Sequence, residues 1–305
     1  MIEYGEQDYR DLCRSGRVAL EISTIEEKRK DAVRRFWLLL LGGVALAAGL
    51  IWATAAAADP DALGFGIAGA IGIVILATIF AALPLGKAGK ALKLPTLETL
   101  AEKGGLTYME TGFDPPVYPE ARKALFGSWL SSQSFTDLFH GADADGRRFA
   151  LYEGTLTRRQ GKNTHTVFSG QMYAWQRRAK SGAEIVIVPD RGIFNFFKPL
   201  GGMERVRFEN DPDFERKFEV YAYEPQQAMM VVGTDLRRLL LELRQAGRVL
   251  GYIGPEDAFV AATGRNRFEA GSMFRSVSGE QRVRAMFDDL CAGLATLRRL
   301  RAALD

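Results

Sequence analysis

The sequence predicts an α+β protein with an N-terminal two-helix transmembrane hairpin, followed by a soluble domain with an antiparallel β-sheet and a long C-terminal amphipathic helix. Three observations predict this fold. Between Phe36 and Leu85 the only charged residues are two aspartates. Segments with alternating apolar and polar residues follow, and apolar residues near the C-terminus recur at helical spacing. The strands do not alternate regularly with helices, which favours an antiparallel over a doubly wound sheet.

Length and composition narrow the possible functions. A chain of 305 residues has room for one large domain or two smaller ones. The formal net charge of +3 is too small to indicate a nucleic-acid partner, and none is expected. The two cysteines have no metal-type spacing, and His140 and His165 are the only histidines. We therefore expect no metal site and no cofactor.

The first 35 residues are polar and balanced in charge, and we expect a cytoplasmic juxtamembrane segment (residues 1–35) that forms a solvated helix. Ser23 with Glu26, or Thr24 with Glu27, offers a capping box for the start of that helix. The basic residues at its end would meet anionic headgroups, at about 1 kcal/mol for each cation near the surface.

Residues 36–86 are predicted to form a transmembrane hairpin with spans at about 36–58 and 62–84. The first run holds 23 uncharged residues, and as a helix it would be roughly 35 Å long, enough to cross the hydrocarbon core. Pro84 and Gly86 are expected to close the second run. A cleaved signal peptide is the alternative, but the first run is long and starts late for one.

The distribution of Lys and Arg predicts the orientation of this hairpin. Basic residues flank it on both sides, whereas the connecting turn carries only acidic residues. The positive-inside rule therefore puts both termini in the cytoplasm, and we expect a multi-pass protein of the bacterial inner membrane. The cations are Lys28, Arg29, Lys30, Arg34 and Arg35 before the hairpin and Lys87, Lys90 and Lys93 after it; the turn holds Asp59 and Asp61.

The stretch GFGIAGAIG places glycines at positions 64, 66 and 69, the spacing of a dinucleotide-binding loop. No strand precedes it and no acidic residue follows at the usual distance, so the required context is missing. Small residues at helical spacing instead indicate close packing between the two spans. The predicted packing residues are Gly42, Gly64, Ala68 and Gly72, with Gly66 and Ala70 on the adjacent face of the second span and Gly43 and Ala47 beside Gly42 on the first.

Residues 87–305 are predicted to form a cytoplasmic α+β domain. Alternating, aromatic-rich segments indicate strands, and capping residues mark the helices. RRQGK is a plausible hairpin turn, and Ser278 with Gln281 forms a capping box before the last helix. Strands are expected at 106–112, 147–157, 163–175, 184–190, 205–210, 217–224, 249–254 and 257–264, and helices after Pro95, at 119–126, from Thr234 or Asp235 to Gly247, and after Ser278.

Part of this domain resembles the DUF3137 family of bacterial membrane-associated proteins of unknown function, over roughly residues 110–270. Three stretches carry the resemblance: SFTDLFHGADADGRRFALYEG, VFSGQMYAW and ERVRFENDPDFERKFEVYAYEPQQAMMVVGTDLRRLLLEL. The resemblance implies no known catalytic residues. Members of the family are often encoded near LemA-type membrane proteins, which implies a partner in a membrane complex.

Candidate chemistry is sparse. Asp143-Ala144-Asp145-Gly146 begins like a calcium loop, but Gly154 stands where the bidentate glutamate belongs, so a turn is favoured. The chain has no G-x-S-x-G and no H-E-x-x-H motif. We therefore assign no catalytic residue. Basic clusters at the two ends of the predicted strand pair are candidate contacts for headgroups or a partner: Arg158, Arg159, Lys162, Arg177, Arg178 and Lys180.

Two classes of function remain open. The favoured hypothesis is a membrane-anchored binding or scaffold module that contacts the lipid bilayer and a membrane or cytosolic protein. The alternative is a membrane-tethered hydrolase that uses carboxylate or histidine groups. That hydrolase would need a cleft with polar groups of shifted pKa, and the residues available to it are His140, His165, Asp137 and Glu153.

Overall fold

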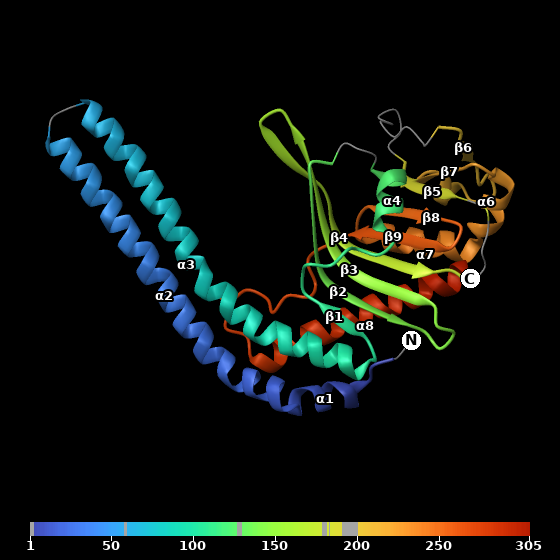
Figure 1. Ribbon diagram of the computed structural model, residues 1–305, viewed down its shortest axis with the longest axis horizontal. Coiled ribbons are helices and arrows are strands. Elements are labelled where there is room, and N and C mark those ends of the chain that lie inside the picture. The colour runs from blue at the N-terminus through green and yellow to red at the C-terminus, as the bar shows by residue number, and fades with distance from the viewer. Residues whose placement is uncertain (1–2, 58–59, 127–129, 179–181, 183, 191–200) are drawn as a thin grey trace. The chain divides into compact units, whose positions relative to one another are not determined.

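Figure 1 shows the computed structural model of the chain, which describes residues 3–57, 60–126, 130–178, 182, 184–190 and 201–305. The chain forms two compact units, and each combines segments that are far apart in the sequence. The hairpin unit comprises residues 5–100 and 269–287. The sheet unit comprises residues 1–4, 101–268 and 288–305. Long apolar N-terminal helices and an antiparallel sheet confirm the predicted α+β class.

The hairpin unit starts with helix α1 (Glu6–Arg14) and the long helix α2 (Gly16–Ala56). Helix α2 passes Ser23 and Thr24 without a break, so the predicted helix start there is wrong. Both hydroxyl groups donate to the Leu20 carbonyl, at 2.8 and 3.0 Å, as Ser and Thr do inside helices. They therefore cap nothing.

Helix α3 (Pro60–Lys103) also runs further than expected, because Pro84 and Pro95 both lie inside it. The predicted end at Pro84 and the separate helix after Pro95 are wrong. A proline inside a helix removes one N–H donor, but α3 buries Ala81 and Ala88 on either side of Pro84, at 0% and 6% exposure. Packing of this face offsets the lost hydrogen bond.

The segment before the apolar part of α2 is packed rather than solvated. Leu12, Val18 and Ile25 are at most 1% exposed. Gly279, from the second segment of the hairpin unit, lies so close to Ile25 that a Cβ on it would come within 2.9 Å of the Ile25 side chain. The expectation of a solvated helix is therefore wrong: its apolar positions are covered by residues distant in the sequence.

The sheet unit is built on a nine-stranded sheet in the order β1-β2-β3-β4-β9-β8-β5-β7-β6, with each neighbouring pair antiparallel. The strand β2 was not predicted, because a bulge between Thr136 and Phe139 interrupts its alternation. The strands are β1 (Thr107–Met109), β2 (Ser132–Ala142), β3 (Arg148–Gln160), β4 (Asn163–Gln176), β5 (Ile185–Pro189), β6 (Glu204–Val206), β7 (Phe218–Ala222), β8 (Val249–Ile253) and β9 (Asp257–Thr263).

Helices cover both faces of this sheet. Tyr152 and Met172 are paired across β3 and β4 and pack in one core with helix α4 (Tyr118–Leu125). On the opposite face, helix α8 (Gly279–Leu304) places Gly293 against Leu151. Helix α7 (Thr234–Ala246) lies next to α8, where Arg299 donates to Glu242 at 2.8 Å. Two short helices, α5 (Pro212–Glu215) and α6 (Pro225–Val231), flank β7.

The capping box predicted for the last helix is present. The Gln281 N–H donates to the Ser278 hydroxyl at 3.2 Å, and the Ser278 N–H donates to the Gln281 side chain at 3.3 Å. Reciprocal bonds of this kind satisfy two N–H groups at a helix start. The residues of α8 from Asp288 onward belong to the sheet unit, and those before it to the hairpin unit.

Candidate functional site

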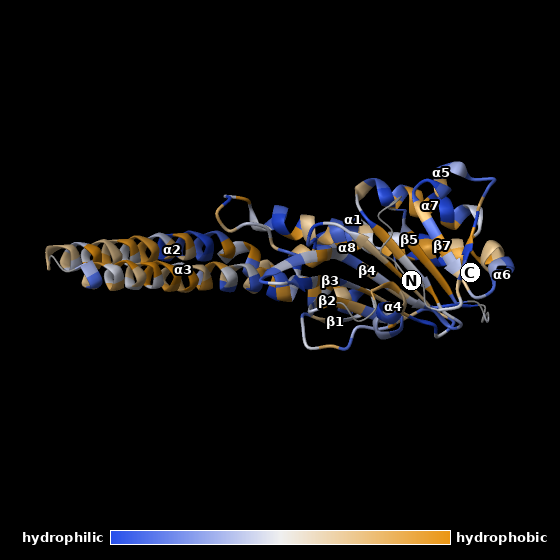
Figure 2. Cartoon of the chain, turned by 90° about the horizontal axis from the view of Figure 1, so that it is seen from above, coloured by the Kyte–Doolittle hydropathy of each residue, from blue (hydrophilic) through white to orange (hydrophobic). Residues whose placement is uncertain are grey.

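The apolar parts of α2 and α3 expose most of their large side chains. Leu46, Trp52 and Phe65 are 68%, 75% and 80% exposed, and Figure 2 shows the apolar residues following both helices. In the most apolar 18-residue stretch, only 11% of the residues of α2 and 17% of those of α3 are buried. A core helix of a soluble protein would be mostly buried. By length and composition, both helices can cross a membrane.

The two helices approach each other closely at two of the small residues that the sequence indicates, Gly43 of α2 and Gly66 of α3. A Cβ on Gly43 would lie 2.2 Å from the Ala77 Cβ, and one on Gly66 would lie 2.2 Å from the Thr54 hydroxyl. By contrast, a Cβ on Gly42, Gly64 or Gly72 meets no atom within 4 Å, and Ala68 is exposed. Of the small residues that the sequence indicates, Gly43 and Gly66 therefore lie at the contact between the helices, whereas Gly42, Gly64, Ala68 and Gly72 lie on other faces.

Most cations at the basic end of the hairpin are neutralised within the unit. Arg29 is paired with Glu26 at 2.7 Å, and Lys93 is paired with Glu269 at 3.0 Å. The hydrogen bond from Arg29 lowers the pKa of the Glu26 carboxyl to about 2, against the opposing effect of desolvation. Lys87 is exposed and has no ion pair within the part of the chain that the structure describes. Lys87 is therefore available to an external anion, as the exposed Arg34 is.

A pocket of about 430 Å³ lies between α2 and α3 at this basic end. Both charged and apolar side chains line it. The charged group is Lys28, Asp31, Arg35 and Lys87, and the apolar group includes Phe80, Leu83 and Pro84. Lys28 is paired with Glu21 at 2.5 Å, and Arg35 with Asp31 at 2.9 Å.

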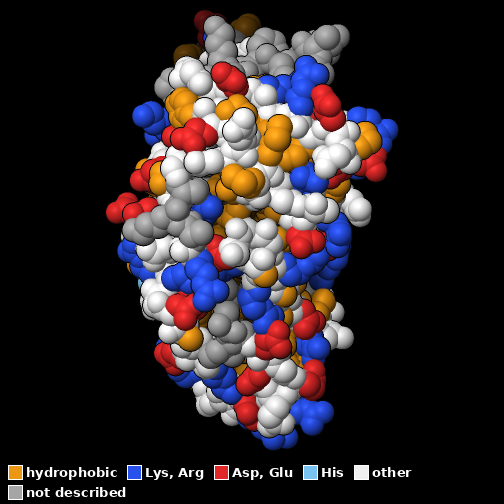
Figure 3. All heavy atoms as spheres, turned by 90° about the vertical axis from the view of Figure 1, so that its right-hand side faces the viewer, with side chains coloured by type: hydrophobic (Ala, Val, Ile, Leu, Met, Phe, Trp, Pro, Cys, Tyr) orange, Lys and Arg blue, Asp and Glu red, His pale blue; other side chains and the backbone are white. Residues whose placement is uncertain are grey.

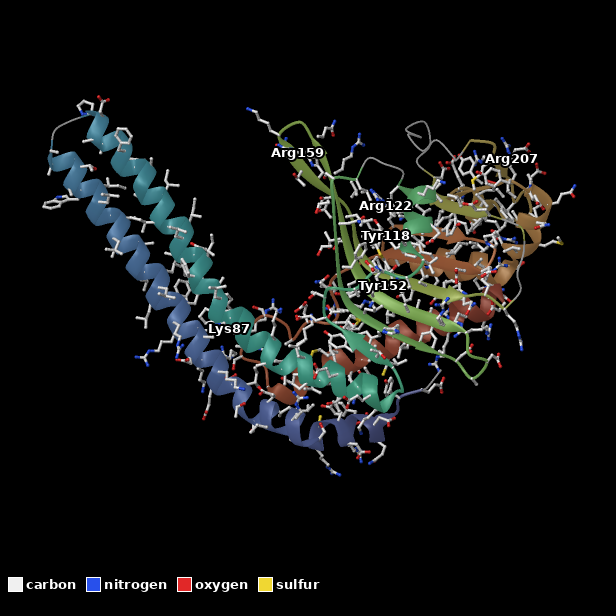
Figure 4. The ribbon with its side chains drawn as sticks, viewed as in Figure 1. Lys87, Tyr118, Arg122, Tyr152, Arg159 and Arg207 are labelled. Carbon is white, nitrogen blue, oxygen red and sulfur yellow. The ribbon has the colours of Figure 1, made fainter. Side chains whose placement is uncertain are left out.

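In the sheet unit, β3 and β4 extend past their neighbours as a two-stranded ribbon, residues 158–165. Pairing of β3 with β2 ends at Thr157, and pairing of β4 with β9 ends at Gly170. The ribbon holds three cations and no acidic residue: Arg158, Arg159 and Lys162, all exposed. Arg159 is at its tip in Figure 4. Three predicted contact residues thus lie together on a protruding element.

The second predicted cluster does not form a comparable surface. Arg177 is only 5% exposed, and its guanidinium donates to the Gly254 carbonyl at 2.9 Å. This hydrogen bond joins the end of β4 to the loop after β8. Because its guanidinium is buried and bonded there, Arg177 is not available to a partner and is no longer a candidate contact. Arg178 is exposed. Lys180, like Asp59 of the hairpin turn, lies outside the described residues.

The four residues named for the hydrolase alternative lie on three strands, and one of them, His140, is half-buried on β2 opposite Ala150. His165 is exposed on the ribbon, opposite Arg158. Asp137 is fully buried and accepts a 2.7 Å hydrogen bond from Tyr108. Glu153 is 1% exposed and accepts a 2.6 Å bond from the Arg267 N–H. Both carboxylates are therefore held by structural donors, and the histidine on the ribbon lies apart from them.

Two polar features of the sheet unit were not predicted. Gln171 lies opposite Glu153 on the α8 side of the sheet and accepts a 2.7 Å bond from Tyr173. Burial is the main cause that raises the pKa of the Tyr173 hydroxyl to about 12, so it stays protonated at neutral pH. The second feature is a hydrogen bond from the Arg301 side chain, near the end of α8, to the Asp143 carboxylate. It joins that helix end to the turn at Asp143.

The Asp143 segment itself is a turn, as the sequence favours. One Asp143 carboxylate oxygen accepts the N–H groups of Asp145 and Arg147, at 3.0 and 2.9 Å. Gly146 adopts φ +75°, which suits glycine in a turn. Within the described residues, no group of His, Cys, Asp and Glu side chains could hold a metal ion.

The surface of the sheet unit shows no second extended basic region on the face seen in Figure 3. Lys and Arg side chains alternate there with Asp and Glu, and apolar side chains lie between them. Mixed charge of this kind is typical of ordinary soluble surfaces. The ribbon at residues 158–165, by contrast, carries cations and no acidic residue.

Comparison with known proteins agrees with the family resemblance. No match is found among the curated proteins. The crystal structure of the mycobacterial trehalose monomycolate transport factor A, TtfA, is similar with a TM-score of 0.40 and 11% identity, over 68% of this chain and 92% of that chain. Residues 166–301 match the family model described as "Protein of unknown function (DUF3137)", which confirms that this chain carries a DUF3137 region.

Proposed function

We propose that this protein is a membrane-anchored binding or scaffold module of the bacterial inner membrane, with the hairpin in the bilayer and both termini in the cytoplasm. The exposed apolar sides of α2 and α3 carry the proposal. In water, so large an apolar surface would drive aggregation, whereas lipid solvates it. The orientation follows from the basic residues that flank the hairpin.

The proposed binding surface is the basic ribbon of the sheet unit. A two-stranded ribbon that extends past the ends of the neighbouring strands buries little apolar surface and adds little stability to the fold. Its three exposed cations suit an acidic surface on a membrane or cytosolic protein. The family resemblance makes a LemA-type membrane protein a partner to test. The hydrolase alternative has less support, because Asp137 and Glu153 are buried and accept structural hydrogen bonds while His165 lies exposed on the ribbon.

Membrane insertion is tested by fractionating cells that express the full-length chain. The wild-type protein should stay in the membrane pellet after an alkaline carbonate wash and dissolve only with detergent. A double variant, Leu46→Asp with Ile75→Asp, changes two exposed apolar positions. Each aspartate should cost about 2.5–3.5 kcal/mol at the centre of a span, so the variant should leave the pellet.

Leu20→Asp is the matched control, because Leu20 is 60% exposed on the same helix α2 but lies before the apolar run. It should remain membrane-bound. Wild-type protein that appears in the detergent-free supernatant would contradict the proposal. So would digestion of the C-terminal part by protease added to intact spheroplasts, since that part should lie inside.

Partner binding is tested by affinity capture from detergent-solubilised membranes, with bound proteins identified by mass spectrometry. A dominant partner should be lost at least tenfold when Arg158, Arg159 and Lys162 are all changed to Gln. The matched control changes three exposed cations elsewhere in the sheet unit, Arg207, Arg216 and Arg238. Equal loss in both variants would reject the ribbon as the binding surface.

A further inference from the structure

We propose that the pocket between α2 and α3 binds the phosphate of an anionic phospholipid from the leaflet next to the basic end of the hairpin. This inference rests on the proposed function, since it needs the hairpin to lie in a bilayer. It goes further in assigning a ligand class to residues of both helices, among them Arg35 and Lys87.

The position of the pocket matches the headgroup region. Arg35 is the last charged residue of α2 before its uncharged run. Lys87 is the first charged residue of α3 after the apolar run that begins at Ala62. Both line the same pocket. If the uncharged runs lie in hydrocarbon, these cations lie at its border, where lipid phosphates are found.

The lining is amphipathic in the same way as a phospholipid. Phe80 and Leu83 line the pocket on the side of the apolar run and are 57% and 52% exposed. They can contact the acyl chains while the phosphate lies against the cations. A free phosphate ion would use only the polar part of a pocket of about 430 Å³. The apolar part therefore favours a lipid over a soluble anion.

The charges of the pocket favour an anion although it holds a carboxylate. Asp31 is engaged by Arg35, at 2.9 Å, and the pair is exposed, so Arg35 keeps donors for a second acceptor. Lys28 already contacts Glu21. Lys87 has no ion pair within the described residues. We therefore assign the first contact to Lys87, with Arg35 in support.

The test counts lipids bound to the full-length protein. The protein is purified in a neutral detergent, titrated with phosphatidylglycerol or phosphatidylcholine, and analysed by native mass spectrometry. We expect one phosphatidylglycerol to be retained preferentially. Lys87→Gln should weaken that binding about fivefold, the factor that corresponds to about 1 kcal/mol for one cation at a membrane surface.

Arg34→Gln is the matched control, because Arg34 is an exposed cation beside Arg35 that is not part of the pocket lining. It removes the same charge and should change phosphatidylglycerol binding less than twofold. Equal weakening by Lys87→Gln and Arg34→Gln would overturn the inference, since the effect would then be general surface attraction. Equal retention of phosphatidylcholine by the wild type would overturn it too.

A third titration uses inorganic phosphate alone. Competition by phosphate at millimolar concentration would show a soluble-anion site and would overturn the lipid assignment. The failure of this inference is distinguishable from the failure of the proposed function. If the wild type stays in the carbonate-washed pellet, and the Lys87→Gln variant binds phosphatidylglycerol as well as the wild type does, the protein is anchored in the membrane but has no lipid site at this pocket.

Discussion

In the sheet unit, Leu151, Phe168 and Phe259 are at most 1% exposed, whereas in the hairpin unit Leu46, Trp52 and Phe65 are 68–80% exposed. Burial of apolar area stabilises the first group by about 25 cal/mol per Å² removed from water. The second group gains nothing from its own chain. The difference is the one that the proposed membrane anchor requires, and each unit can be tested separately.

The largest expected effect comes from removing a buried leucine. Leu151→Ala should lower the free energy of unfolding by about 2–5 kcal/mol, because Leu151 packs against Gly293 and its loss leaves a cavity. The matched change in the hairpin unit is Leu46→Ala, which should cost less than about 0.5 kcal/mol because lipid or detergent fills the space. Denaturant titration in mild detergent, followed by circular dichroism, measures both.

A loss of 2 kcal/mol or more in Leu46→Ala would break the comparison between the units. Leu46 would then be held by protein contacts, and its exposed position would not be a lipid contact. Equal small losses in both variants would instead show that the cavity at Leu151 closes on mutation.

A smaller effect is expected where the two helices of the hairpin meet. Gly43→Ala would place a Cβ 2.2 Å from the Ala77 Cβ, and neither atom can rotate away. Overpacking of this kind costs about 1–3 kcal/mol. Gly42→Ala meets nothing within 4 Å and should be neutral or slightly stabilising, since alanine favours helix more than glycine does. Thermal unfolding in detergent micelles measures the difference.

A second-site change identifies the cause. Gly43→Ala combined with Ala77→Gly moves the methyl group from one helix to the other and should recover most of the lost stability. If Gly42→Ala lowers stability more than Gly43→Ala does, α2 contacts α3 through Gly42, and the contact between Gly43 and Ala77 is contradicted.

The glycine example shows what the sequence could and could not predict. Small residues at helical spacing indicate that two spans pack closely, but several faces of the same helix satisfy the pattern. Gly64, Ala68 and Gly72 fit it as well as Gly66 and Ala70, and only the partner helix selects between them. The two long apolar helices were predictable, because they depend on local hydropathy.

In the sheet unit, too, features set by neighbouring residues in the sequence could be predicted, and features set by distant residues could not. Strands with regular alternation, such as residues 163–175, were predicted to within one residue of the observed β4 (Asn163–Gln176). The bulged strand β2 was missed, because Asp137 at φ +57° breaks the alternation. The burial of Arg177 could not be predicted either, since its acceptor, Gly254, is distant in the sequence.

The pocket residues were visible only as a general excess of cations. The sequence places eight Lys and Arg residues around the hairpin and does not rank them. Partners such as Glu269, which pairs with Lys93, come from distant segments. Only the structure distinguishes Lys87, which lines a pocket, from cations already neutralised within the chain.

The smallest effects concern two carboxylates of equal pKa, one in each unit. Burial tends to raise the pKa of Asp143, but the Arg147 backbone N–H and the Arg301 side chain outweigh it and lower the pKa to about 2. Glu26 in the hairpin unit also has a pKa of about 2, set mainly by its hydrogen bond from Arg29. The Asp143 side chain is 10% exposed and that of Glu26 is 36% exposed. Salt should therefore screen the Glu26 pair more strongly.

Both groups have pKa values below those of the unfolded chain, about 4, so each stabilises the fold above that pH. The contribution is lost as the pH falls from about 4 through about 2. Asp143→Asn should thus lower stability at pH 7 and match the wild type near pH 2. In about 1 M salt, where the Debye length is about 3 Å, the Glu26→Gln effect should vanish while the Asp143→Asn effect persists. Denaturant titration across pH at low and high salt measures both, and equal salt sensitivity would show that Asp143 is as solvated as Glu26.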